Sequence, residues 1–92
     1  MFAGRQPPTV RPVPSFVLEH RHTAAECKTA YAAWRGYDSP LRELPAAASC
    51  ASGGHGLFWT VQASSSAQAL AQLPPWLAER TRIESVSDVA LP

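Results

Sequence analysis

Residues 15–22 read SFVLEHRH, and this stretch decides the fold. Its alternate positions form two sets: Phe16, Leu18, His20 and His22 in one, and Val17, Glu19 and Arg21 in the other. A period of two places alternate side chains on opposite faces of the backbone, so the pattern predicts a β-strand. One face is apolar and runs into two histidines. The other carries an acid and a base, which tolerate water or pair across an interface.

A helix is predicted directly after this strand. Thr23 and Glu26 have the spacing of a capping box, in which a hydroxyl and a carboxylate satisfy the free amides of the first turn. The helix is expected to continue to about Arg35 and to end at Gly36. Its inner stripe follows helical spacing: Cys27, Ala30, Tyr31 and Trp34. Cys27 is therefore expected to face the sheet from the first turn.

Two more strands are predicted over residues 46–52 and 55–63, joined by Gly53-Gly54 as a two-residue hairpin turn. That turn would pair Ser52 with His55 and Cys50 with Leu57, and cross-strand partners share a face of the sheet.

A second helix is expected from about Ser66, where Ser65 and Gln68 form a possible capping box, with a kink or a restart at Pro74-Pro75. Its inner stripe is Ala67, Leu70, Leu73 and Leu77. A last strand lies within residues 81–91, with a bulge or bend near Ser87 and Asp88.

This β-α-β-β-α-β order over residues 15–91 resembles the ferredoxin-like fold. The resemblance implies an α+β protein, a ferredoxin-like βαββαβ sandwich with a four-stranded antiparallel sheet in the order 4-1-3-2 and two helices on one face. The same fold underlies the dimeric α/β-barrel proteins, in which two sheets pack through their bare faces. They include small isomerases, cofactor-independent monooxygenases, haem-degrading enzymes and metal-binding proteins. A homodimer is therefore expected, with Val17, Phe58 and Val86 among the residues of its buried face.

Length and composition narrow the function classes. The 92 residues suit one domain, expected at 15–92 after an extended, proline-rich arm at 1–14. The net charge is +1 and the arginines are scattered, which argues against nucleic-acid binding. We see neither an apolar run of membrane-spanning length nor a secretory signal, so we expect no membrane partner and a cytoplasmic location. Cysteines there are more often thiols or ligands than disulfides.

All the histidines and cysteines of the chain are expected to converge at one end of the sheet: His20, His22, Cys27, Cys50 and His55. Thiolate and imidazole are the preferred ligands of zinc, and they also suit copper or nickel. We therefore predict a divalent-metal site with zinc as the expected ion, whose affinity falls below about pH 6 because the ligands must lose their protons. His22 and His55 are the strongest candidates. Cys27 follows, because a helix N-terminus stabilises a thiolate. Cys50 lies two residues further from the turn, so it either ligates or only packs behind the site, and His20 either supports a ligand or replaces one.

Two alternatives remain open. The first is a small-molecule-binding enzyme of the isomerase or monooxygenase type, with His20 or His22 as the general base. Its pocket would be lined by aromatic residues: Tyr31, Trp34, Tyr37, Phe58, Trp59 and Trp76. The second is a structural interaction subunit without chemistry of its own, which the proline-rich arm, the low charge and an exposed Trp76 would suit.

Overall fold

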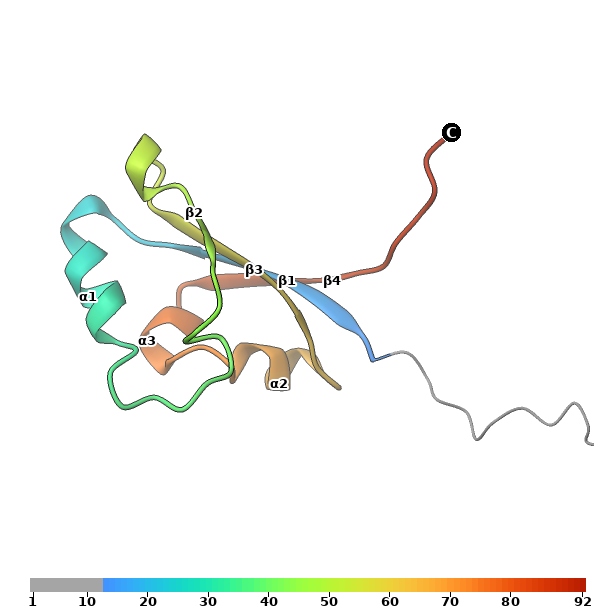
Figure 1. Ribbon diagram of the computed structural model, residues 1–92, viewed down its shortest axis with the longest axis horizontal. Coiled ribbons are helices and arrows are strands. Elements are labelled where there is room, and N and C mark those ends of the chain that lie inside the picture. Colours follow the sequence, from blue (N-terminus) through green and yellow to red (C-terminus); the bar gives the residue numbers. More distant parts are fainter. Residues whose placement is uncertain (1–12) are drawn as a thin grey trace, which may run out of the picture.

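The computed structural model describes residues 13–92, and Figure 1 shows how their helices and strands are arranged. The strands are β1 (Ser15–Arg21), β2 (Ala47–Ala48), β3 (Gly56–Gln62) and β4 (Thr81–Val86). The helices are α1 (Cys27–Ala32), α2 (Ser66–Leu70) and α3 (Pro75–Ala78), and two short 3₁₀ turns are η1 (Ala24–Glu26) and η2 (Cys50–Ser52). Residues 1–12 of the expected N-terminal arm lie outside the described residues.

The four strands form one sheet in the order β2-β3-β1-β4, and every neighbouring pair is antiparallel. The predicted α+β class and four-stranded antiparallel sheet are therefore confirmed. As expected, β1 and β2 point the same way and β3 runs between them in the opposite direction. The three α-helices lie below the sheet in Figure 1. The alternation of β1 is also confirmed, because Phe16, Leu18 and His20 are buried while Val17 and Glu19 are half-buried.

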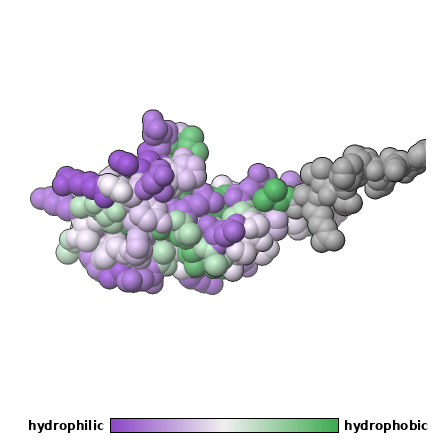
Figure 2. Space-filling model, turned by 90° about the horizontal axis from the view of Figure 1, so that it is seen from below, coloured by the Kyte–Doolittle hydropathy of each residue, from purple (hydrophilic) through white to green (hydrophobic). Residues whose placement is uncertain are grey.

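The hydrophobic core lies between the sheet and the helical segments. Its buried residues come from β1, from β3, from the loop between α1 and β2, and from residues 63–77: Phe16, Leu18, Leu41, Trp59, Val61, Ala63, Ala69, Leu73 and Leu77. The rings of Trp34 and Trp59 meet with their centroids 6.0 Å apart. Trp76 is half-buried against this core, so the expectation that it is exposed was wrong. Seen from below, the helical side mixes hydrophilic and hydrophobic residues (Figure 2).

The caps of both helical segments were predicted correctly, but the helices are shorter than expected. The Thr23 N–H donates to the Glu26 carboxylate at 2.9 Å, and the Gln68 N–H donates to Ser65 Oγ at 3.1 Å. The first helix begins as a 3₁₀ turn and ends at Ala32 instead of Arg35. Tyr31 is 72% exposed, so its place in the inner stripe was wrong.

The second helical segment divides at the two prolines, which agrees with one of the two expected outcomes. Pro75 occupies the first turn of α3, where its missing N–H costs no hydrogen bond. The helix α2 is only five residues long. Ala69 is buried and Ala67 is exposed, which corrects the predicted stripe: Ala69 lies four and eight positions before the buried Leu73 and Leu77, whereas Ala67 does not.

The hairpin that contains Cys50 differs from its predicted register. Leu57 pairs with Ala48, not with Cys50, because residues 50–52 turn into the 3₁₀ segment η2 instead of extending β2. The pairing of Ser52 with His55 was wrong for the same reason. Ser49 stabilises this wider turn, since its Oγ accepts from the Gly56 N–H at 2.9 Å.

The last strand ends earlier than expected. β4 stops at Val86, so the strand has already ended at the predicted bulge, and Val89 and Leu91 are exposed. None of the helices in residues 13–92 has both the length and the apolar character needed to cross a bilayer.

Candidate metal centre

Four of the five predicted ligands meet at one end of the sheet. His22 follows the end of β1, Cys27 begins α1, Cys50 begins η2 and His55 precedes β3. The backbone N–H of His22 donates to the backbone carbonyl of His55 at 3.2 Å, and this bond holds the ends of β1 and β3 together. The distant parts of the chain converge here because β3 runs antiparallel to β1 and returns to the point where β1 ended (Figure 1).

Side-chain ligand atoms of these four residues, called here the His2Cys2 cluster, all lie within 4.8 Å of one another. Cys27 Sγ is 3.2 Å from His55 Nδ1 and 3.4 Å from His22 Nε2. Cys50 Sγ is 3.8 Å from the same His22 nitrogen. In a tetrahedral zinc site with ordinary bond lengths, nitrogen and sulfur ligands are about 3.5 Å apart. The three printed distances are near this value, so the cluster could hold a metal ion, and all four residues are half-buried.

The Cys27 thiol is not activated in the way that the sequence suggested. Partial burial raises the pKa of Cys27, and the neighbouring Cys50 thiol raises it further. A helix N-terminus acts in the opposite direction, but α1 has only six residues and is preceded by the η1 turn. Cys27 is therefore a protonated thiol at neutral pH, and a metal ion that bound there would have to displace its proton.

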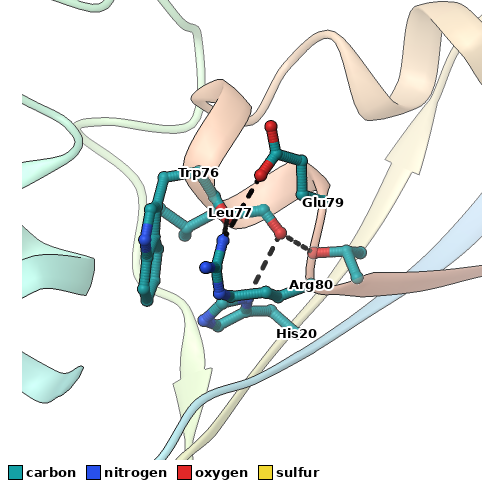
Figure 3. A network of polar contacts seen from close by, with 6 residues as sticks. His20, Trp76, Leu77, Glu79 and Arg80 are labelled. Atoms are coloured by element: carbon teal, nitrogen blue, oxygen red, sulfur yellow. Dashed lines mark hydrogen bonds and ion pairs between the residues drawn. The ribbon is translucent and has the colours of Figure 1, made fainter. Parts of the chain in front are cut away.

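His20 lies behind the His2Cys2 cluster. It is fully buried, its Nε2 is 2.9 Å from His22 Nδ1, and its Nδ1 is 3.3 Å from the Leu77 carbonyl oxygen. Burial lowers the pKa of His20, which favours the neutral ring. Since both ring nitrogens have partners and the ring is inaccessible, His20 does not suit the role of general base in an open pocket. Figure 3 shows its contact with Leu77. This carbonyl partner was not predicted, because a backbone group leaves no trace in residue type.

His55 has an unusual backbone conformation. Its φ of +51° lies in the left-handed region, which side chains with a Cβ adopt at a cost of about 1–2 kcal/mol. Two glycines precede it. Gly53 also has a positive φ, and a Cβ on Gly54 would lie 2.6 Å from Ser49 Oγ. The turn therefore requires both glycines. It directs the His55 side chain toward Cys27, although glycine would adopt the backbone conformation of position 55 with less strain.

We expect His55→Gly to separate this strain from ligation. In chelator-treated protein, His55→Gly should be more stable than His55→Ala by about 1 kcal/mol, because glycine adopts a positive φ without penalty. Both variants lose the imidazole, so if His55 is a metal ligand, both should bind zinc more weakly than wild type. Urea unfolding and a zinc titration measure the two effects. Equal stability of the two variants would show that position 55 is unstrained.

A surface groove of about 410 Å³ lies beside the His2Cys2 cluster. It is lined by Tyr31, Trp34, Leu41, Arg42, Leu44, Ala46, Ala48, Leu57 and Trp59. Three of the six aromatic residues expected in a pocket are among them, whereas Tyr37, Phe58 and Trp76 are not. A smaller cavity, lined by His22, Cys50, Tyr31 and Trp34 among others, joins the groove region to the cluster.

In the comparisons with known proteins, no family model, no curated protein and no solved structure matches the chain.

Proposed function

We propose that this protein binds one divalent metal ion, zinc, through His22, Cys27, Cys50 and His55. The observation that carries the proposal is the mutual distance of the four ligand atoms, none of which is more than 4.8 Å from another. Two thiolates and two neutral imidazoles suit zinc, and the two negative charges balance a divalent ion in a half-buried site. Copper and nickel use the same ligand types, but a tetrahedral set of nitrogen and sulfur atoms favours zinc.

The proposed role of the metal is structural. Four protein ligands fill a tetrahedral coordination sphere and leave no position for a substrate or an activated water. The elements that carry the two cysteines are short, since α1 has six residues and η2 has three. Such elements gain little from their own hydrogen bonds, so a metal that ties them to the end of β1 would supply much of the local stability.

Elemental analysis combined with native mass spectrometry tests the proposal. Protein purified without chelators or metal-affinity steps should contain one zinc ion per chain, and chelator-treated protein should take up one equivalent again. The His22→Ala variant should not retain the ion. Glu26→Gln is the matched control, because it changes an acidic neighbour of the cluster while glutamine still suits the capping box. Metal-free protein that takes up no zinc, copper or nickel would refute the proposal.

The pH dependence of zinc affinity follows from the raised pKa of Cys27. At neutral pH this thiol is protonated without metal, so binding releases its proton and becomes weaker as the pH falls. With one to two protons released, the Kd should rise by about 10–100-fold for each pH unit below neutrality. Competition titrations with a chelator at pH 6.0, 6.5, 7.0 and 7.5 measure this slope. A Kd independent of pH would exclude thiolate ligation.

We also propose that the fold is ferredoxin-like and that the protein forms a homodimer through the open face of its sheet. The sheet order supports the first point, because read from β4 it is 4-1-3-2. For the second, the open face combines apolar side chains with both charges: Val17, Phe58, Val86, Glu19, Glu84, Arg21 and Arg82. In a two-fold dimer the acids of one copy can meet the bases of the other.

The dimer is testable by sedimentation at tens of micromolar protein. The wild-type chain should sediment as a dimer, while Phe58→Glu should be a monomer because it would bury an unpaired charge. Arg35→Glu, an exposed change on the helical side, is the control and should remain dimeric. A monomeric wild-type protein would contradict the proposal.

Two thiolate ligands also persist best in a reducing compartment, which supports the expectation of a cytoplasmic protein.

A further inference from the structure

We propose that His20 is a positioning residue of the metal site, which fixes the tautomer of His22 through a relay that ends at the Leu77 carbonyl. This inference rests on the proposed metal-binding function. The relay consists of two contacts: His22 Nδ1 to His20 Nε2 at 2.9 Å, and His20 Nδ1 to the Leu77 oxygen at 3.3 Å.

The Leu77 carbonyl determines which ring nitrogen carries the proton in His20 and, through it, in His22. A carbonyl oxygen only accepts hydrogen bonds, so the proton of the neutral His20 ring must be on Nδ1. His20 Nε2 then has a free lone pair and accepts from His22, which places the His22 proton on its own Nδ1. His22 Nε2 is left with a lone pair, and this is the atom that lies 3.4 Å from Cys27 Sγ and 3.8 Å from Cys50 Sγ. The relay therefore presents the unprotonated nitrogen to the thiols.

The surroundings of His20 hold the relay rigid. His20 has no exposed surface and sits opposite Thr81 of β4 in the sheet register. The Leu77 oxygen also accepts from Thr81 Oγ1 at 2.6 Å and from the Arg80 N–H at 2.9 Å, so three donors converge on it. The Trp76 ring lies 5.9 Å from the His20 ring, and the Arg80 guanidinium stacks on Trp76 at 4.0 Å (Figure 3). The outer end of the relay is thus the Leu77 carbonyl of α3, which Arg80 and Thr81 also hold at the start of β4.

A buried imidazole with these partners has a different role from the four ligands. Histidines that bind metals almost always donate their second ring nitrogen to a fixed acceptor, and loss of such an acceptor typically weakens metal binding by about 10–100-fold. In most proteins this acceptor is a carboxylate, a carbonyl or water. Here the neutral ring of His20 is the acceptor for His22, and its own orientation is fixed by its hydrogen bond to the Leu77 carbonyl.

The experiment measures zinc affinity and the His22 tautomer in parallel. His20→Phe keeps an aromatic ring but has neither acceptor nor donor, and we expect its Kd for zinc to rise by about 10–100-fold. His20→Gln offers an acceptor for His22 and a donor for Leu77, and it should recover most of this loss. Phe16→Leu, on the same buried face of β1 but away from both histidines, is the control; its affinity should equal that of wild type.

Long-range ¹H–¹⁵N NMR identifies the ring nitrogen of His22 that carries the proton. If His20 only filled space in the core, it would not determine this tautomer. In wild-type protein, with and without zinc, His22 should carry its proton on Nδ1. A proton on Nε2 in the metal-free protein, or unchanged zinc affinity in both His20 variants, would overturn the inference while leaving the metal site intact. If His20→Phe does not fold, the wild-type spectrum and His20→Gln decide. Failure of wild-type protein to bind zinc would instead refute the proposed function.

Discussion

Replacing Cys27 with serine is expected to remove the stabilisation that zinc gives to the folded protein. An ion that binds only the folded state adds about 4 kcal/mol to the free energy of unfolding when its free concentration is about 1,000 times its Kd. For a domain of this size, that corresponds to an increase in Tm of about 15–30 °C. Cys27 Sγ contacts both histidines of the cluster, so the Cys27→Ser variant should show only a small part of this increase.

Thermal unfolding with zinc and with chelator measures the effect for both proteins. The chelator-treated variant should unfold close to chelator-treated wild type, because Ser differs from Cys by one atom and the site is only half-buried. Glu26→Gln again serves as the control and should gain the full zinc increment. A Cys27→Ser protein that zinc stabilises as strongly as wild type would exclude Cys27 as a ligand.

Leu18→Ala is expected to be the most damaging substitution in the core. Leu18 is fully buried at the centre of the sheet, where it pairs with Trp59 on one side and Ile83 on the other. Removing its side chain from such a position costs about 2–5 kcal/mol, through lost burial and the remaining cavity. Domains have about 5–15 kcal/mol of stability in total, and small ones lie toward the lower limit.

The consequence should be a protein that depends on its metal. Chelator-treated Leu18→Ala should be largely unfolded or unfold at low urea concentration, whereas zinc should restore a cooperative transition, because binding and core packing add when the sites are separate. Val17→Ala, one residue away on the half-buried face, should lose less than half as much stability. Similar losses in both variants would show that the two faces of β1 are equally covered.

The parts of the fold that could be predicted are those set by neighbours in the sequence. The alternation in residues 15–22 defines β1, and the caps at Thr23 and Ser65 define the starts of the helical segments. The hairpin register could not be predicted from Gly53-Gly54, because the Ser49 side chain bonds the Gly56 N–H and favours a wider turn.

The candidate site was more predictable than the hairpin that supports it. Cys50 was assigned to the cluster through a pairing with Leu57 that does not exist, and it reaches the cluster through η2 instead. A signal independent of register is the mirrored spacing of the ligands: Cys27 follows His22 by five positions, and His55 follows Cys50 by five. Each pair brackets a tight reversal of the chain, so its members can meet whatever the exact strand pairing is.

The proposed metal would also close a loop of the chain. An ion held by Cys27 and Cys50 closes a ring around residues 28–49, of which 37–46 contain no helix or strand. The entropy of closing a flexible ring grows only with the logarithm of its length, about 0.6 kcal/mol for each doubling. Tyr37, Ser39 and Leu41 attach the first half of this segment to the core, but residues 42–46 are exposed. Extra residues inserted there would therefore cost the metal-bound domain little, and the loop is the natural place for this small fold to gain length.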